Sequence, residues 1–180
     1  MQDKLSILGI CGSLRSGSYN SSLLAAMQQL APETIDFVVF DAVGDLPLFN
    51  PDRGEENIVG INRLNEAVAW ADGIVIATPE YAGGISGVIK NTLDWLVGGP
   101  NFINVPIALP NTSPRASLAQ AAIRTVLVTM SGIIVEEASV KIPLLGSELD
   151  ASGIVQDKTL RQIVLKSLTE FEAGIRRLEQ

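Results

Sequence analysis

Apolar residues along the chain follow two patterns: short, nearly continuous runs, and longer stretches in which they recur every three or four positions. The runs are typical of buried strands, and the recurring pattern is typical of helices with one apolar face. Five strands are predicted, at residues 5–11, 35–40, 73–78, 105–109 and 133–140. Five helices are predicted, at residues 20–31, 58–71, 88–97, 115–131 and 158–178. This alternation predicts an α/β fold, a doubly wound, five-stranded parallel sheet of order 2-1-3-4-5 with helices on both faces.

The segments between these elements read as loops. A long polar loop is expected at residues 41–57, a glycine-rich loop at 79–87, and a solvated acidic loop at 150–157. No repeat, linker or low-complexity tract interrupts the pattern, so residues 1–180 are expected to form a single domain.

Composition narrows the classes of function. The 180 residues are 47% hydrophobic and 18% charged, which is typical of a globular protein. A formal charge of −7 without a basic stripe argues against a nucleic-acid partner. No apolar run is long enough to span a bilayer, and residues 1–4 lead into a strand without a signal-peptide pattern, so a cytoplasmic protein is expected.

Cysteine and histidine usage argues against several kinds of catalytic centre. The chain has one cysteine and no histidine, so no disulfide framework, zinc site or histidine-based triad is predicted. Cys11 lies in a strand pattern and is expected to be a small core residue. No metal site and no catalytic side chain are predicted, and any chemistry would come from a bound cofactor.

The segment between the first strand and the first helix is rich in glycine and hydroxyl residues. Gly12 and Gly17 allow a tight turn and close approach to a ligand, and Arg15 adds a cation. The next helix starts with unpartnered backbone N–H groups, so the loop predicts a phosphate site. Ser18 stands where a triphosphate-binding loop needs lysine, and no Gly-x-Gly-x-x-Gly occurs, which disfavours a nucleotide triphosphatase and the usual dinucleotide fold. The alternative is a serine-rich turn in which Ser18 or Asn20 caps the helix.

The predicted strand order makes a second loop a candidate. Such sheets bind ligands at the carboxyl ends of strands 1 and 3, so the loop after strand 3 should also be a binding loop. Residues 79–87 are glycine-rich and include Tyr81, which can present its ring to a flat ligand. The alternative is a glycine-rich turn with Tyr81 half buried.

Two motifs, in order, resemble the NADPH-dependent FMN reductase family of flavodoxin-like proteins, which includes quinone, azo-dye and chromate reductases. They are Gly12-Ser13-Leu14-Arg15-x-Gly17-Ser18-x-Asn20, then Pro79-Glu80-Tyr81 with Gly87-x-x-Lys90-Asn91-x-x-Asp94-Trp95. The resemblance implies contacts to the FMN phosphate and ribityl chain from Ser13, Arg15, Ser18, Asn20 and Ser21. It implies an isoalloxazine site lined by Pro79, Glu80, Tyr81, Ala82 and Gly83. It also implies contacts to the other side of the ring from Asn111, Thr112 and Ser113.

The resemblance implies partners as well. NADPH or NADH would be the electron donor, a quinone or similar small molecule the acceptor, and the protein a homodimer or homotetramer. Arg15 would hold either the FMN phosphate or the phosphate of NADPH, and the sequence does not separate the two. Lys90 and Asp94, one helical turn apart, form either a surface ion pair or, with Trp95, part of a subunit contact.

The chain also departs from the family pattern. Ala82-Gly83-Gly84 stands where relatives carry asparagine-glycine-serine, and Ser86 stands where they carry proline. Pro110 and Pro114 stiffen the loop after the fourth strand and remove two backbone donors. Two hypotheses follow: an FMN-dependent NAD(P)H reductase of quinones, or a flavodoxin-like protein that binds FMN or another phosphate ligand without efficient turnover.

Overall fold

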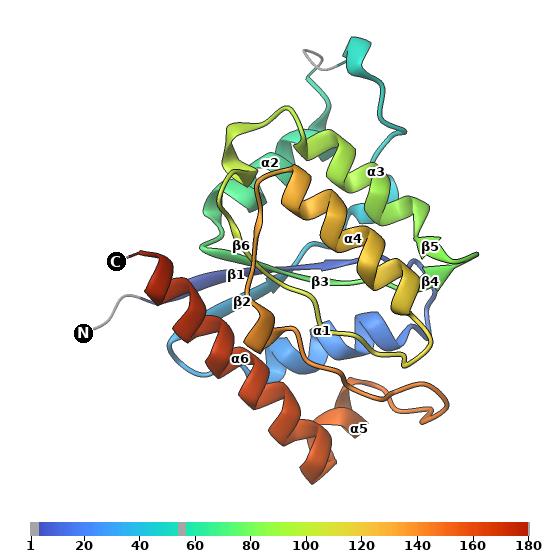
Figure 1. Cartoon of the computed structure of the whole chain (residues 1–180), viewed down its shortest axis with the longest axis vertical. Helices are drawn as coiled ribbons and strands as arrows, with labels where there is room; N and C mark the ends of the chain where they lie inside the picture. Colours follow the sequence, from blue (N-terminus) through green and yellow to red (C-terminus); the bar gives the residue numbers. More distant parts are fainter. Residues whose placement is uncertain (1–3, 54–56, 180) are drawn as a thin grey trace.

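A computed structural model describes residues 4–53 and 57–179, and a five-stranded parallel sheet runs through its middle (Figure 1). Its strands are β1 (Leu5–Cys11), β2 (Ile35–Val39), β3 (Gly73–Ala77), β6 (Pro106–Ala108) and β7 (Ile133–Ile134). Their order is β2-β1-β3-β6-β7, which confirms the predicted order 2-1-3-4-5. The carboxyl ends of β1 and β3 therefore lie side by side, as the prediction of a ligand site requires.

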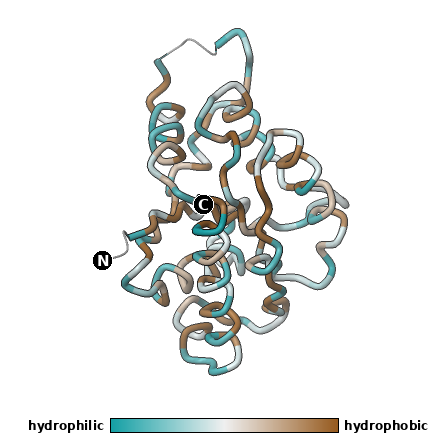
Figure 2. Tube along the Cα trace, turned by 60° about the vertical axis from the view of Figure 1, so that its left-hand side comes forward, coloured by the Kyte–Doolittle hydropathy of each residue, from teal (hydrophilic) through white to brown (hydrophobic). Residues whose placement is uncertain are grey.

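Helices cover both faces of the sheet (Figure 1). One face carries α1 (Tyr19–Leu30), α5 (Ala151–Gln156) and α6 (Lys158–Leu178), and the other carries α2 (Val59–Trp70), α3 (Gly87–Leu96) and α4 (Ser117–Thr129). Neighbouring strand residues point to opposite faces, so Ile7 packs in the core beneath α1 and α6 while Leu8 packs in the core beneath α2 and α3. Figure 2 shows the hydrophobic stretches running through the middle of the molecule.

The long loop at 41–57 contains two single 3-10 turns, η1 (Val43–Asp45) and η2 (Pro51–Arg53), and residues 54–56 lie outside the described part. Side chains of α3 fix its middle: Asn91 Nδ2 and Trp95 Nε1 both donate to the Pro47 carbonyl, at 3.0 and 2.8 Å. The Phe49 ring meets Trp95 edge-on at 5.1 Å. Trp95 is thus buried as an anchor within its own chain, and Lys90 forms the predicted surface ion pair with Asp94.

Three local predictions were wrong. Residues 79–87 contain a small antiparallel hairpin, β4 (Glu80–Tyr81) and β5 (Gly84–Ile85). The fifth strand ends at Ile134 rather than at residue 140, because the chain turns into η4 (Glu136–Ala138), where the N–H of Ala138 bonds the carbonyl of Val135. The acidic stretch 150–157 holds α5, because Ile154 is fully buried and anchors a helical turn against α1 and α6.

Asp150 caps α5 by accepting the N–H of Gly153, and Asp157 caps α6 by accepting those of Thr159 and Leu160. A further 3-10 turn, η3 (Pro100–Phe102), leads into β6. Within residues 4–53 and 57–179, no helix combines the length and hydropathy needed to cross a membrane.

Candidate functional site

A cavity of about 300 Å³ lies at the carboxyl ends of β1, β3 and β6, where the loops after these strands meet. Most of the predicted site residues line it: Ser13, Arg15, Ser18, Asn20, Pro79, Glu80, Tyr81, Thr112 and Ser113. Gly17, expected to allow close approach to a ligand, also lines it, and the remaining lining residues, not predicted, are Tyr19, Thr78, Arg115, Ala116 and Leu145. Ser21, Ala82, Gly83 and Asn111, which were also predicted, do not line it. The loops that follow β1, β3 and β6 thus line one cavity, as the strand order predicts.

Close packing brings the first two loops together. A Cβ atom added to Gly12 would lie 2.4 Å from Thr78 Oγ1, a distance that real atoms do not tolerate. Glycine at position 12 therefore lets the end of β1 touch the end of β3. Thr78 Oγ1 in turn lies 3.4 Å from Ser86 Oγ, which caps α3 by accepting the N–H of Ile89.

Serine hydroxyls set the shape of the β1–α1 loop. Ser18 is the N-cap of α1, and its Oγ accepts the N–H of Asn20 at 3.2 Å. Ser13 Oγ accepts the N–H of Arg15 at 3.4 Å. In both contacts the hydroxyl acts as acceptor, so its proton stays available to donate into the cavity. Ser21 instead donates its hydroxyl to the Ser18 carbonyl at 2.8 Å, which uses its proton within the helix.

Asn20 and Thr112 join the first loop to the third. Thr112 Oγ1 donates to Asn20 Oδ1 at 3.1 Å, and both side chains are about 5% exposed. The Thr112 carbonyl accepts the N–H of Leu144, which ties the segment after β7 to the same point. In the third loop the N–H of Ser113 donates to Asn111 Oδ1 at 3.0 Å. Side chains predicted to contact a cofactor therefore also hold the walls of the cavity in place.

The hairpin forms the wall opposite α1, and Glu80 fixes it to α4. Glu80 Oε2 accepts the N–H of Ala119 at 2.9 Å, in the first turn of α4. Ala116, the residue before α4, provides no side-chain cap, so the Glu80 carboxylate takes that role and faces the positive end of the helix dipole. Tyr81 stands at the rim, 49% exposed.

The cavity has a positive character. The guanidinium groups of Arg15 and Arg115 have no hydrogen bond or ion pair with any residue in 4–53 or 57–179, and Glu80 is the one acidic residue among the lining residues. The N-terminus of α1 adds partial positive charge. A chain of net charge −7 thus gathers unpaired positive charge at this point, which favours an anionic group such as a phosphate.

Cys11 is buried at the end of β1 and does not line the cavity. Burial raises the pKa of its thiol, and a backbone hydrogen bond with Ser13 lowers that pKa by a smaller amount. The thiol stays protonated at neutral pH and is a poor nucleophile. The prediction of a core cysteine is confirmed. The residues from 4 to 53 and from 57 to 179 contain no cluster of three potential metal ligands.

Some of the missed lining residues carried a signal in the sequence. Thr78 ends the third strand and Arg115 follows the fourth, so the rule that ligands sit at carboxyl strand ends points to both. Leu145 carried none, because its place depends on the path of the chain after β7, which the predicted longer strand misrepresented.

Comparison with known proteins agrees with this geometry. A family model described as NADPH-dependent FMN reductase matches residues 5–144. An NAD(P)H-dependent FMN reductase of Pseudomonas aeruginosa is 33% identical over 184 residues, with 99% of each chain covered. A quinone reductase of Escherichia coli K12 is 27% identical over 187 residues, covering 99% of this chain and all of that one.

A solved structure shows the same likeness in three dimensions. It is FerB of Paracoccus denitrificans, titled a flavoenzyme NAD(P)H:(acceptor) oxidoreductase. It superimposes with a TM-score of 0.85 at 27% identity, covering 96% of this chain and 98% of that one. From the extent of the family match and the relative at 33% identity, we conclude that the chain belongs to the NADPH-dependent FMN reductase family.

Proposed function

We propose that the protein is an FMN-dependent NAD(P)H oxidoreductase that reduces quinones or similar small acceptors. The observation that carries the proposal is the cavity shared by the three loops, with two unpaired arginines and the start of α1 facing it. Membership of a family that uses FMN and NADPH supports it, as do relatives named quinone reductases. Bound FMN supplies the redox chemistry, hydride transfer from NAD(P)H and delivery of electrons to the acceptor.

The donors around the β1–α1 loop fit the phosphate end of FMN. Arg15 and Arg115 offer unpaired guanidinium groups, and the hydroxyls of Ser13 and Ser18 keep their protons free for an anionic oxygen. We assign the phosphate to these side chains and to the first turn of α1. Ser21 we assign to shaping that turn, since its hydroxyl proton is already bound by the Ser18 carbonyl.

The other two loops fit a flat ring. Pro79, Glu80 and Tyr81 form one wall, and we assign Ala82 and Gly83 to the turn that holds this wall rather than to ring contacts. On the facing loop the N–H of Ser113 donates to Asn111 Oδ1 and the N–H of Asn111 donates to the Val140 carbonyl, which leaves the N–H of Thr112 as the remaining backbone donor of residues 111–113. A donor facing a ring carbonyl stabilises negative charge on the ring, so Thr112 is our candidate for that contact.

Flavin content and turnover of the purified protein test the proposal. We expect a yellow protein that oxidises NADPH or NADH when a quinone is added. Colour without oxidation supports the alternative, an FMN-binding protein without efficient turnover. That alternative is motivated by the loop after β6, in which Pro110 and Pro114 have no N–H to donate and the N–H of Ser113 is already bound to Asn111. Failure to bind FMN refutes both of these flavin hypotheses.

Substitution of Arg15 tests the phosphate assignment separately. Arg15→Ala removes a charge-assisted contact and should weaken FMN binding by about ten- to a hundredfold. Ser18→Ala should weaken it less, and it also removes the α1 cap. Arg161→Ala is the matched control, because Arg161 is an exposed arginine of α6 that does not line the cavity. Equal FMN affinity in Arg15→Ala and Arg161→Ala refutes the assignment.

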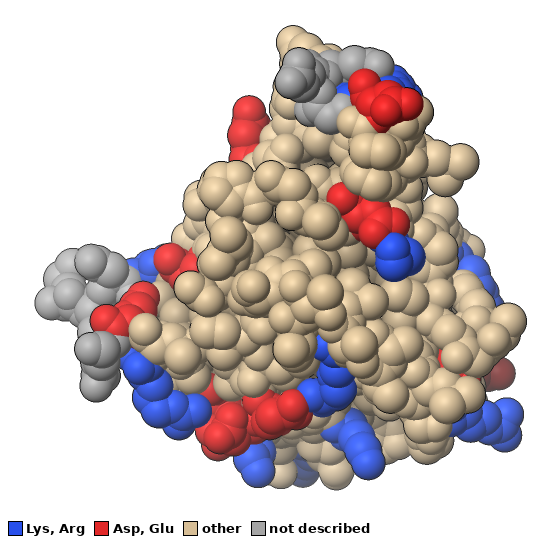
Figure 3. Space-filling view, turned by 45° about the horizontal axis from the view of Figure 1, so that its top comes forward, with Lys and Arg blue, Asp and Glu red and all other residues tan. Residues whose placement is uncertain are grey.

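The proposal extends to assembly, location and domain organisation. We propose a cytoplasmic homodimer or homotetramer of one flavodoxin-like domain spanning residues 1–180. The exposed residues of α4 carry no charge and include Leu118 and Val128, more than 60% exposed, and Figure 3 shows a broad face with few charged side chains. Sedimentation of the wild type and of Val128→Glu tests assembly. A monomeric wild type refutes this part.

A further inference from the structure

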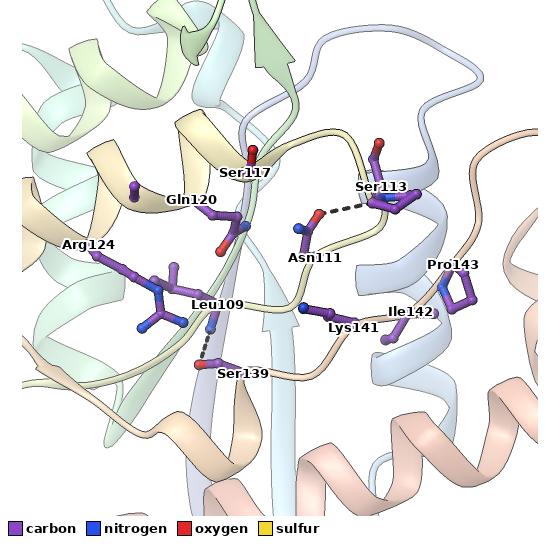
Figure 4. Close-up of a pocket in the computed structure, with 12 residues that line it drawn as sticks. Leu109, Asn111, Ser113, Ser117, Gln120, Arg124, Ser139, Lys141, Ile142 and Pro143 are labelled. Atoms are coloured by element: carbon purple, nitrogen blue, oxygen red, sulfur yellow. Dashed lines mark hydrogen bonds between the residues drawn. The ribbon is translucent and has the colours of Figure 1, made fainter.

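A second and larger cavity, of about 660 Å³, lies between α4 and the segment that follows η4 (Figure 4). It adjoins the first cavity, because Ser113 lines both. Its apolar lining includes Leu109, Ile142 and Pro143, and its polar lining includes Asn111, Gln120, Arg124 and Lys141. The volume lies in the range of small-molecule sites, and an apolar surface with a few polar groups is typical of them.

Two cations stand on opposite walls of this cavity. Arg124 comes from α4 and Lys141 from the facing segment, and Figure 4 shows both directed toward the space between them. Arg124 pairs with Glu136, while the Lys141 ammonium has neither an ion pair nor a hydrogen bond with the residues at 4–53 and 57–179. The lining includes no acidic residue, so the cavity has excess positive charge in an acidic chain.

Gln120 adds an independent observation. Its Nε2 is buried and is the one buried side-chain polar atom left without a hydrogen-bond partner in the described part of the chain. Buried polar groups are almost always paired, so an orphaned donor at the wall of a cavity calls for a partner inside it. Asn111 faces the same space, and its Oδ1 is already bound by the N–H of Ser113, which leaves its NH₂ group to donate (Figure 4).

We propose that this cavity binds an organic anion, whose phosphate or carboxylate oxygens accept from Lys141, Arg124 and the Gln120 amide. Its apolar body would lie on the exposed lining residues Pro114, Ala121 and Pro143. The donors converge from two chain segments, and none of the lining residues offers a negative charge to repel the anion. Because the cavity adjoins the proposed FMN site, the anion is part of a redox substrate, and this step rests on the proposed function.

Two substrates carry such a group: the phosphate-bearing end of the nicotinamide donor, and an acceptor with a carboxylate. Direct binding to the FMN-loaded protein tests the site itself, with adenosine 2′-monophosphate and benzoate as probes and calorimetry as the readout. We expect one of the probes to bind, and Lys141→Gln to weaken its binding by about tenfold. Gln120→Glu should weaken it further, because the new carboxylate pairs with the cations that the probe needs.

Lys166→Gln is the control: Lys166 is also exposed, without an ion pair among the described residues, and it lies on α6 away from the cavity. It should bind the probe as the wild type does. Absence of binding by both probes overturns the proposal, and so does binding that neither Lys141→Gln nor Gln120→Glu weakens. Retained flavin with active reduction of a neutral quinone shows that the proposed function survives such a failure.

Steady-state kinetics identify the source of the anion. If it is the donor, Lys141→Gln raises the KM for NADPH relative to that for NADH. If it is the acceptor, the variant raises the KM for a carboxylated quinone relative to that for a neutral one. If the wild type binds a probe but Lys141→Gln changes neither KM ratio, the assignment of the anion to a redox substrate is overturned.

Discussion

The tip of the β4–β5 hairpin holds a strained alanine, and its replacement should stabilise the protein. Ala82 and Gly83 join Tyr81 to Gly84 as a two-residue turn, and their φ angles are +49° and +74°. Positive φ at both central positions is the pattern of a type I′ turn, which favours asparagine followed by glycine. Alanine in this left-handed region costs about 1–2 kcal/mol, whereas asparagine adopts it more readily.

The expected gain follows from what each replacement changes. Ala82→Asn should recover most of the strain, about 1 kcal/mol, because the exposed Ala82 side chain gives up no burial. Ala82→Gly relieves the same strain but adds about 0.5–1 kcal/mol of unfolded-state entropy, so it should be close to neutral. For a chain of this length, the asparagine variant should melt about 2–4 °C higher.

Urea unfolding followed by circular dichroism measures the effect as a shift in midpoint at constant slope. Ala173→Asn is the opposite control, because Ala173 is exposed within α6 and asparagine there should lose about 0.6 kcal/mol of helix propensity. An Ala82→Asn variant that is no more stable than the wild type, beside an Ala173→Asn variant that loses stability as expected, would refute a left-handed Ala82.

Three further predictions concern contacts around the site. Glu80→Ala removes the acceptor for the Ala119 N–H and should cost about 1 kcal/mol in urea unfolding, with Glu80→Gln recovering part of it; equal stability of both variants and the wild type would contradict the cap. Trp95→Phe loses the hydrogen bond to the Pro47 carbonyl, so it should lower the free energy of unfolding by about 1 kcal/mol and speed proteolysis of the segment 46–50. Unchanged cleavage would show that other contacts hold this loop. Burial raises the pKa of the Cys11 thiol, so the unfolded chain loses this proton at lower pH than the native protein, and the free energy of unfolding should fall as pH rises above about 8.5. Urea unfolding at about pH 7 and pH 10 should show a smaller fall in Cys11→Ala than in the wild type. An equal fall in the two proteins would refute the link to Cys11.

The parts of the fold that the sequence predicts are those with long, regular signals. The α6 helix matches its predicted bounds because its apolar positions recur over 21 residues. Each strand of the β4–β5 hairpin has two residues, too few to show alternation. The strand at 133–140 was overestimated because its apolar residues continue past Ile134, whereas the backbone leaves the strand at η4 and pairs again only in an isolated bridge between Asn111 and Lys141. Periodicity reports burial, and Val135 and Ala138 are buried outside a strand.

The candidate site divides in the same way. The loops at Ser13 and Tyr81 could be placed because the order of parallel strands decides which ends meet. The contact of Glu80 with α4 spans 39 residues of sequence and depends on where that helix starts in space. Lys141 directly follows the predicted strand 133–140, whose path turns at η4, so no sequence pattern could have placed Lys141 opposite Arg124.

The loops of the FMN candidate site are held by contacts within the protein. Gly12 packs on Thr78, Asn20 binds Thr112, and Glu80 holds the hairpin to α4, so binding need not order these loops and its free energy is not reduced by that step. The same contacts decide which variants report on FMN. Replacing Asn20 would loosen Thr112 as well, so lost affinity would combine a missing contact with a moved wall. The guanidinium of Arg15 binds no described residue, and the backbone contact of Arg15 to Ser13 survives in Arg15→Ala, so the loss of affinity in that variant measures the ligand contact itself.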